Sequence, residues 1–290
     1  MEPALAALPG HVLWRARLRV ATELAEVLPA GVDHHALAVL RTLEDGTARS
    51  QQDLARATGA SRTTIGAVAA DLVARGLVAR VRNPGDRRSY LLTATDDGLV
   101  ALVDWSAQVA RRADHLLGAL PARDSDELRR LLLACTTDLL DPDTPPSLLA
   151  SPGHLLVRLH EHLHRRATDD LAALDLEPRH VGSLTALDAR GSSTQADLAR
   201  ALGLSGARVV QLVDDLERRD LVERRRDPAD RRAHLLHLTA RTPALLARAH
   251  AVAGGTVDAV LAPLDDEQRA RLHLLLLALA EAPHPAADEG

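Results

Sequence analysis

Gln51-Gln-Asp-Leu-Ala-Arg-Ala-Thr-Gly-Ala-Ser61 returns 144 residues later as Gln195-Ala-Asp-Leu-Ala-Arg-Ala-Leu-Gly-Leu-Ser205. When Gln51 to Thr95 is read without a gap against Gln195 to Thr239, 22 of 45 positions are identical. A repeat of this length corresponds to a whole domain and not to one unit of a solenoid. The sequence is therefore interpreted as a tandem duplication.

The duplication predicts two domains, at residues 1–146 and 147–290. Their junction lies in Asp141-Pro-Asp-Thr-Pro-Pro-Ser147, where three prolines within five residues interrupt any helix. The chain has 290 residues, of which 46% are hydrophobic and 26% charged, which suits two globular domains of about 150 residues each. This composition excludes a disordered or collagen-like chain.

Composition also narrows the class of protein. No apolar run approaches the roughly 18 to 20 residues of a membrane span, and the first residues lack the basic region of a secretory signal. We therefore expect a cytoplasmic protein with no membrane partner. Because Cys135 is the only cysteine, an internal disulfide, a four-cysteine metal site and a CxxC redox pair are excluded.

Each copy contains a predicted helix-turn-helix. In the first copy, a short helix at about Gln51–Ala57 precedes a tight Thr58-Gly59-Ala60 turn and a longer helix that Ser61 caps. Gly76 ends the longer helix, because glycine adopts the left-handed conformation without strain. At the same position the second copy has Asp220, which tolerates that conformation with slight strain.

A β-hairpin is predicted after the longer helix. Leu77–Arg82 and Ser89–Thr93 alternate as strands do, and they flank the turn formers of Asn83-Pro-Gly-Asp-Arg-Arg88. Helices at about 96–120 and 125–140 complete the copy. The expected fold class is therefore mainly α with small β-hairpin wings, in tandem winged helix-turn-helix domains.

Positive charge is concentrated around the predicted hairpins. The window Arg75–Leu92 carries plus 4 and the window Arg219–Leu236 carries plus 2, whereas the remainder must carry minus 11 to reach the total of minus 5. Charged hairpins are commonly solvated edges that block strand pairing. Here the pattern occurs twice, each time after a helix-turn-helix, which favours double-stranded DNA as the partner.

These residues resemble the MarR family of bacterial transcription regulators. The resemblance rests on Asp-Leu-Ala before the capped helix, Leu-Val-x-Arg after it, and the wing motifs Asn83-Pro-Gly-Asp-Arg-Arg88 and Asp227-Pro-Ala-Asp-Arg-Arg232. It implies domains whose first and last helices build a dimer and whose recognition helices read adjacent half-sites. It also implies a repressor that a small-molecule effector or an oxidant releases from DNA.

The resemblance further implies roles for individual residues. Recognition-helix and wing-tip residues would contact DNA, namely Ser61, Arg62, Thr63, Thr64, Arg87, Ser205, Arg208, Gln211 and Arg231. Asp86 with Arg88, and Asp230 with Arg232, would hold the shape of the two wings. Gly206 and Ala207 stand where the first copy has Arg62 and Thr63, so the two copies are expected to read DNA differently.

One chain supplies both copies, so we expect an intramolecular pseudo-dimer that is monomeric in solution. Its halves are predicted to pack through four leucine-rich segments, Leu13–Leu28, Leu128–Leu140, Leu155–Leu174 and Leu272–Leu279. Covalent linkage makes such an assembly independent of concentration, and unlike heads suit an imperfect palindrome.

Other patterns leave alternatives open. His160-Glu-His-Leu-His164 matches the HExxH zinc motif, but no downstream third ligand can be assigned. We expect no enzyme, no metal and no cofactor. The alternatives are a zinc-binding sensor or hydrolase using His160 and His164, and a winged-helix scaffold that binds protein instead of DNA.

Several single residues have two interpretations. The resemblance places Trp14 and Trp105 at the border of an effector pocket, although core packing is the usual role of tryptophan. Cys135 lies in an apolar stretch, where a buried thiol is more typical than a redox sensor. His34, His35, His234 and His237 titrate near neutral pH in their ordinary state, which leaves a coupling of DNA binding to acidity open.

Overall fold

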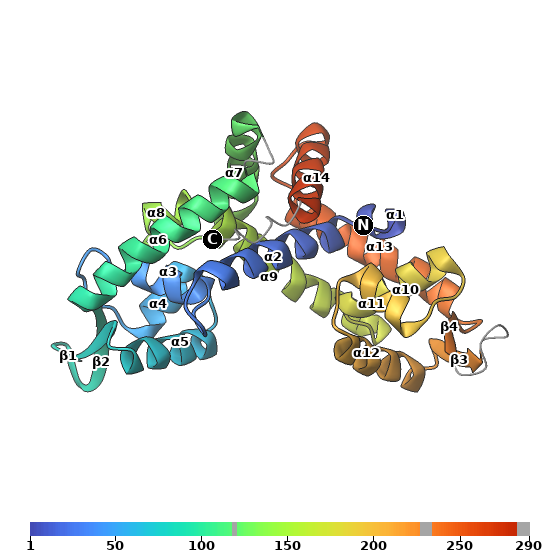
Figure 1. Cartoon of the computed structure of the whole chain (residues 1–290), viewed down its shortest axis with the longest axis horizontal. Coiled ribbons are helices and arrows are strands. Elements are labelled where there is room, and N and C mark those ends of the chain that lie inside the picture. Colours follow the sequence, from blue (N-terminus) through green and yellow to red (C-terminus); the bar gives the residue numbers. More distant parts are fainter. Residues whose placement is uncertain (118–120, 227–233, 283–290) are drawn as a thin grey trace, which may run out of the picture. The chain divides into compact units, whose positions relative to one another are not determined.

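The structure is a computed structural model that describes residues 1–117, 121–226 and 234–282, without the side chains of residues 87, 113–117 and 122. Helices and two small hairpins make up both repeats (Figure 1). The first repeat contains α1 (Pro3–Ala6), α2 (Pro9–Val27), α3 (His34–Thr42), α4 (Gln51–Thr58), α5 (Arg62–Ala74), β1 (Val78–Asn83), β2 (Asp86–Ala94), α6 (Asp96–Leu117) and α7 (Ala122–Thr136). A 3-10 helix, Thr137–Leu139, follows α7.

The second repeat has its α-helices and strands in the same order. It contains α8 (Pro146–Leu149), α9 (Pro152–Leu171), a 3-10 helix (Ala172–Leu174), α10 (Pro178–Arg190), α11 (Gln195–Leu202), α12 (Gly206–Arg218), β3 (Val222–Arg226), β4 (His234–Leu238), α13 (Thr242–Val260) and α14 (Asp266–Glu281). The predicted fold class, mainly α with two hairpin wings, is confirmed. None of the described helices combines the length and the apolar character that crossing a bilayer requires.

The chain forms two compact units, and each unit contains parts of both repeats. Unit 1 consists of Met1–Trp14 and His160–Ala262, and unit 2 consists of Arg15–Leu159 and Pro263–Gly290. The division falls within α2 and within α9. The predicted domains 1–146 and 147–290 describe the sequence repeats and stay a prediction.

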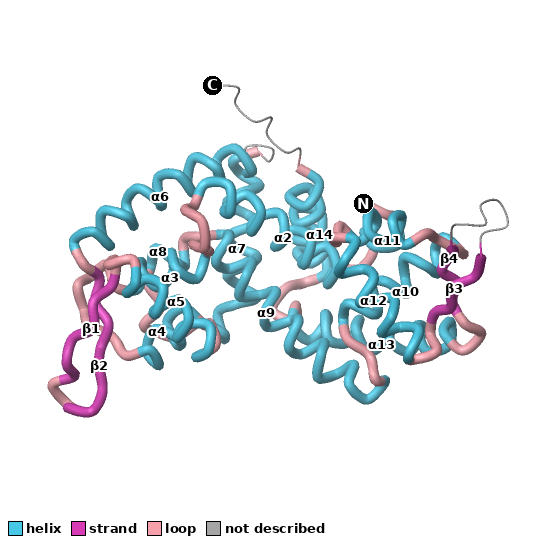
Figure 2. The backbone as a smooth tube through the Cα atoms, turned by 60° about the horizontal axis from the view of Figure 1, so that its bottom comes forward, coloured by secondary structure: helices cyan, strands magenta, loops and turns pink. Residues whose placement is uncertain are grey.

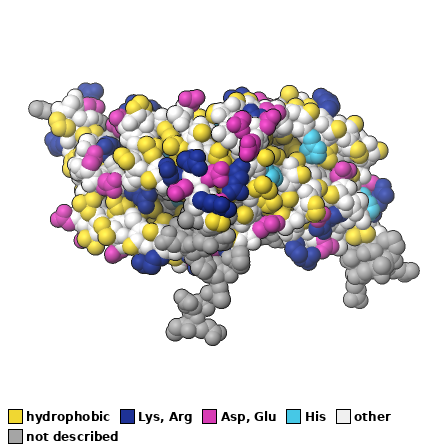
Figure 3. Space-filling view, turned by 90° about the horizontal axis from the view of Figure 1, so that it is seen from above, with side chains coloured by type: hydrophobic (Ala, Val, Ile, Leu, Met, Phe, Trp, Pro, Cys, Tyr) yellow, Lys and Arg dark blue, Asp and Glu magenta, His cyan; other side chains and the backbone are white. Residues whose placement is uncertain are grey.

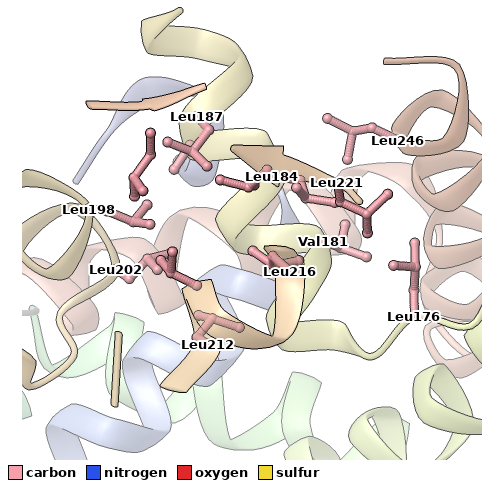
Figure 4. Packing of buried hydrophobic residues seen from close by; sticks show 14 of the residues in the cluster. Leu176, Val181, Leu184, Leu187, Leu198, Leu202, Leu212, Leu216, Leu221 and Leu246 are labelled. Carbon is pink, nitrogen blue, oxygen red and sulfur yellow. The ribbon is translucent and has the colours of Figure 1, made fainter. Parts of the chain in front are cut away.

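In unit 1, the start of the first repeat packs on the second repeat. α1 contacts α10, where Leu5 is fully buried in the core and Glu2 Oε2 accepts a hydrogen bond from Arg190 Nη2 at 2.6 Å. Figure 4 shows this core, in which Leu184, Leu198 and Leu216 extend from α10, α11 and α12 toward one another. Burying each of these leucines contributes about 1.5 to 3 kcal/mol, so packing joins the three helices.

In unit 2, the second repeat contributes α8 and α14. α8 packs on α3, and its Leu148 is 2% exposed. α14 packs on α7, where Arg271 Nη2 lies 2.5 Å from Asp124 Oδ1 and Arg271 Nε lies 2.8 Å from Glu127 Oε2. The last helices of the two repeats are therefore neighbours.

The hairpin β1–β2 is longer than the sequence predicts. β2 begins at Asp86, whereas the alternation predicts a strand only from Ser89. Asn83 pairs with Asp86, its Oδ1 accepts a hydrogen bond from Gly85 N at 2.9 Å, and its Nδ2 donates to Ser89 Oγ at 3.0 Å. These bonds extend the ladder into the segment that the Pro and Gly residues predicted to be all turn.

Candidate nucleic-acid interface

The first head, defined as α4, α5 and the hairpin β1–β2, has a helix-turn-helix set by local sequence. Ser50 and Asp53 form a capping box at the start of α4, and Gly59 ends that helix with φ +69°. Ser61 Oγ then accepts a hydrogen bond from Thr64 N at 3.0 Å and starts α5. The predicted turn and cap are confirmed, and they fix the direction in which α5 leaves α4.

The first turn of α5 faces outward. Ile65 and Leu72 are fully buried on the inner side, while Ser61, Arg62 and Thr63 are exposed. Thr64 is half-buried, and its hydroxyl lies 2.8 Å from Ser61 Oγ. The structure therefore brings these four predicted residues to one outward helix end, with Arg62 and Thr63 free to reach a partner.

Residues distant in sequence hold the turn between α4 and α5. Arg158 of α9, only 6% exposed, donates from its guanidinium to the carbonyl oxygens of Gly59 and, at 2.9 Å, Leu139. Thr144 Oγ1 donates to Ala57 O at 3.1 Å. Sequence reasoning missed both contacts, because no local pattern shows which carbonyl groups a distant side chain satisfies.

The wing of the first head carries arginines that are open to solvent. Arg80, Arg82 and Arg88 are exposed, and no ion pair joins them or Arg62 to a carboxylate within the part of the chain that the structure describes. Asp86 Oδ1 accepts a hydrogen bond from the backbone N–H of Arg88 at 3.0 Å. The contact between this predicted pair thus involves main chain, and the side chain of Arg87 lies outside the described atoms.

The second head, defined as α11, α12 and the hairpin β3–β4, presents a different outer surface. Ser205, Arg208 and Gln211 are exposed, as is Val210 at 43%. Ser205 makes no side-chain cap bond to the described residues, and a Cβ added at Gly206 would meet nothing within 4 Å. The predicted residues Asp230, Arg231 and Arg232 lie outside the described residues.

Carboxylates of α12 bind the wing of the second head. Arg224 Nη2 donates to Asp214 Oδ1 at 2.7 Å, and Arg224 Nη1 donates to Glu217 Oε2. Arg225 is paired with Glu223. Two of the arginines in this basic hairpin are therefore already neutralised, in contrast to the wing of the first head.

A buried histidine fixes α12 to α10. His180 Nδ1 accepts a hydrogen bond from Glu177 N at 3.0 Å, so the other ring nitrogen, Nε2, carries the proton and donates to Asp215 Oδ2 at 2.8 Å. Burial lowers the pKa of His180, although the charge of Asp215 acts in the opposite sense. The neutral ring of His180 therefore acts as a structural link between α12 and α10.

Unit 2 contains a cavity of about 110 Å³. Its walls are mainly apolar side chains of α2, α3, α6, α7, α8, α9 and α14, with Arg41, Arg112, Ser151 and His154 among its polar residues. Nε2 of His34 and Nε2 of His154 are buried without a hydrogen-bond partner among the described atoms. Burial, as the largest cause, lowers the pKa of His34 to about 3 and that of His154 to about 4.

The predicted pocket residues lie elsewhere. Trp105 is 7% exposed in a hydrophobic core of unit 2, and Trp14 packs against His11 with ring centroids 5.3 Å apart. Neither tryptophan is among the residues that line the cavity. Cys135 is buried, and burial raises the pKa of its thiol to about 11, which disfavours the reactive thiolate.

The histidines of the HExxH match do not gather a ligand set. The rings of His160 and His164 stack with centroids 5.8 Å apart. Within residues 1–117, 121–226 and 234–282, the one group of three potential metal ligands is Asp33, His34 and His35, whose ligand atoms lie within 4.8 Å of one another. Asp33 Oδ1 already accepts hydrogen bonds from two backbone N–H groups, as an N-cap does.

Basic and acidic side chains lie interspersed on the face shown in Figure 3. The hairpins, drawn as magenta strands in Figure 2, extend beyond the helices of their own units. In the first head, a projecting hairpin whose Arg80, Arg82 and Arg88 form no ion pair with the described residues lies beside an exposed helix start.

A helix-turn-helix followed by a two-stranded wing defines both heads as winged-helix domains. The sequence profile of the MarR family matches residues 30–89 and again residues 174–233, and the chain belongs to the MarR family. The HTH-type transcriptional repressor NicR of Pseudomonas putida is 31% identical over 104 residues, which cover 36% of this chain and 66% of that repressor.

Two solved structures show the extent of the likeness. The transcriptional repressor CouR, bound to a 23-mer DNA duplex, is 31% identical with a TM-score of 0.42, and the match covers 44% of this chain and 90% of that one. BpsR of Bordetella bronchiseptica, whose DNA binding is regulated by 6-hydroxynicotinic acid, is 25% identical with a TM-score of 0.44 and coverages of 46% and 96%.

Proposed function

We propose that this chain is a sequence-specific regulator that binds double-stranded DNA and represses transcription in the cytoplasm. The observation that carries the proposal is the exposed first turn of α5 beside a hairpin with unpaired arginines, repeated in altered form at α12. A helix of this kind fits the major groove, and a wing arginine fits the narrower minor groove. Membership of the MarR family and the likeness to the repressor NicR support this function and favour a regulator over an enzyme.

Both heads act from one polypeptide in this proposal. α14 of the second repeat packs on α7 of the first, and α1 of the first repeat packs on α10 of the second. These exchanged segments support an intramolecular pseudo-dimer that binds DNA as a monomer. Light scattering tests this point, because a mass of two chains with no single-chain species would contradict it.

The cavity of unit 2 is the proposed effector site. An occupant with an apolar body and one polar group facing Nε2 of His34 and Nε2 of His154 would complement its walls. The lining segment 148–156 lies between Thr144 and Arg158, which hold the turn before α5. Movement of this segment by a ligand would therefore reach the recognition helix.

DNA binding is tested with fragments selected by the chain from its own genome. Affinity is measured against salt for the wild type, Arg62→Ala and Arg208→Ala. Each phosphate contact adds about 0.9 to the log-log slope, so a multi-contact binder shows a steep loss of affinity with salt. Retention of duplex that salt does not weaken, or no retention at all, would contradict the proposal and favour a protein-binding scaffold.

The effector site is tested separately. Candidate metabolites are screened for those that raise the melting temperature and release the selected DNA. Ala38 lines the cavity and is 3% exposed, so Ala38→Leu fills part of the space. We expect this variant to bind DNA as the wild type does but to lose its response to the metabolite. A full response in Ala38→Leu would place the effector elsewhere.

A further inference from the structure

The two recognition helices differ in charge at positions that the repeat aligns. Asp214 and Glu217 of α12 stand where α5 has Ala70 and Val73. The wing residue Arg224 stands where the first head has Arg80. The second head therefore carries two carboxylates on its recognition helix that the first head lacks, together with the same wing arginine.

Asp214 lies on the outward face of α12. Ala207, Gln211 and Asp214 are exposed at spacings of four and three residues, which places them on one side of a helix. The side chain of Asp214 is 54% exposed. A carboxylate on that side would lie near the negative phosphates if α12 entered a groove, and it would oppose binding.

Arg224 is the residue that these carboxylates engage. Its guanidinium donates to Asp214 and to Glu217, and its side chain is 28% exposed. Arg80, in contrast, is exposed with no carboxylate partner among the residues that the structure describes. An arginine whose charge is neutralised by two carboxylates attracts phosphate less strongly than a free one.

We propose that Asp214 and Glu217 weaken the second head's attraction for DNA, so that the first head supplies most of the electrostatic affinity. The chain then reads an operator with one strongly held and one weakly held half-site. This inference rests on the proposed DNA binding and adds to it the unequal division of affinity between the heads. The two carboxylates act as specificity-determining residues. Because they reduce the attraction of the second head for phosphates, this head binds only a half-site whose base contacts compensate for that loss.

The direct test removes both negative charges while keeping polar side chains. Asp214→Asn/Glu217→Gln is compared with the wild type on a random-sequence duplex of about 30 base pairs, which is about three helical turns. If Arg224 is thereby released to bind one further phosphate, the log-log salt slope should steepen by about 0.9 and binding should tighten about three- to tenfold at low salt. Partly exposed ion pairs contribute little to stability, so the variant should fold, which thermal unfolding verifies.

A matched control separates position from net charge. Asp104→Asn/Asp188→Asn removes the same charge from exposed positions of α6 and α10, outside the recognition helices. We expect this pair to leave the salt slope unchanged. An equally large increase in affinity in the control pair would assign the effect to net charge and overturn the inference.

The reciprocal variant introduces a carboxylate into the first head at the position that Asp214 occupies in the second. Ala70 is exposed on α5, so Ala70→Asp places a carboxylate at the position of Asp214, within the head whose wing carries Arg80. Weaker binding with a shallower salt slope is expected. The inference is overturned if Asp214→Asn/Glu217→Gln leaves both affinity and slope unchanged while Arg62→Ala still weakens binding. A wild type without salt-dependent binding instead overturns the proposed function itself.

Discussion

The two heads share a backbone and differ in the chemistry of their outer surfaces. Gly76 and Asp220 both end their recognition helices with positive φ, +74° and +56°. Thr95 Oγ1 donates to Gly76 O at 2.7 Å, and Thr239 Oγ1 donates to Asp220 O at 2.8 Å. Turns and hydrogen bonds that hold the helix have thus persisted in both copies.

The outward residues have changed most. The first head presents Arg62 and an unpaired Arg80, whereas the second presents Gly206 and an Arg224 that two carboxylates engage. Within one chain, the framework of a winged helix and its outer surface therefore vary independently. Four experiments test how far the two heads differ.

The largest effect of a single substitution is expected at the turn of the first head. A Cβ at Gly59 would lie 1.8 Å from Arg158 Cζ, so Gly59→Ala displaces a buried guanidinium and strains a backbone with φ +69°. The lost hydrogen bonds and the strain should cost about 2 to 4 kcal/mol of unfolding free energy. Urea unfolding measures the loss. Gly76→Ala is the control, because it has positive φ but open space around it, and it should lose only about 1 kcal/mol. Equal losses in the two variants would contradict the claim that Arg158 stabilises the turn at Gly59.

The wing tips come next. Arg87→Ala and Arg231→Ala should each weaken binding to the selected operator by about 1 to 3 kcal/mol, if the tip arginines enter the minor groove. We expect the loss from Arg87→Ala to be larger, since the second head holds DNA less strongly. Fluorescence anisotropy on one operator measures both. Unchanged affinity in the two variants would remove the wing assignment, and a larger loss from Arg231→Ala would reverse the ranking of the heads.

Acid should destabilise unit 2 more than unit 1. The pKa of His154 is lowered from 6.5 to about 4 and that of His34 to about 3, so each ring is neutral when folded and takes up a proton on unfolding below pH 6.5. The free energy of unfolding therefore has its full value above pH 6.5. It falls as the pH drops toward 4, by about 1.4 kcal/mol per pH unit for each histidine. In unit 1 the pKa of His180 is lowered as well. Because this is one such histidine against the two in unit 2, a smaller loss of unfolding free energy is expected in unit 1.

The tryptophans allow the two units to be followed separately. Trp14 belongs to unit 1 and Trp105 to unit 2, so Trp14→Phe and Trp105→Phe each leave one fluorescent reporter. Unfolding is measured in urea between about pH 7.5 and pH 5. His154→Gln should flatten the pH dependence of the Trp105 signal. An unchanged dependence in that variant would contradict the role of His154.

The smallest effect is expected at the end of α12. Asp220 adopts φ +56°, so Asp220→Gly relieves a strain of about 1 kcal/mol, partly offset by the greater freedom of glycine in the unfolded chain. A rise in melting temperature of a few degrees or less is expected from calorimetry. A clear loss of stability would show that the 3.9 Å contact between Asp220 and Arg241 matters more than the strain.

Local chemistry explains which features could be predicted from sequence. The Ser61 cap, the Gly59 turn and the left-handed Gly76 follow from residues within a few positions of one another. The Arg158 contact with Gly59 joins residues that are 99 positions apart, and the residues that line the cavity come from seven helices. Such contacts depend on tertiary packing, which neither periodicity nor turn signals contain.

The strand boundary was missed for a related reason. Pro84 and Gly85 are strong turn formers, and they led to the prediction of a turn over the whole of residues 83–88. The Gly85 N–H donates to Asn83 Oδ1 and Asn83 Nδ2 donates to Ser89 Oγ, and these bonds allow the ladder to continue closer to the tip. Side-chain to main-chain bonds of this kind compete with propensity, and the sequence does not show which will form.

The two separate chain segments that form unit 2 determine when this unit can fold during translation. This unit needs Arg15–Leu159 together with the segment that begins at Pro263, so α7 meets α14 only after more than one hundred intervening residues have been synthesised. The winged helix translated first is consequently the one completed last. Until α14 has been synthesised, the face of α7 that packs on it stays without this cover.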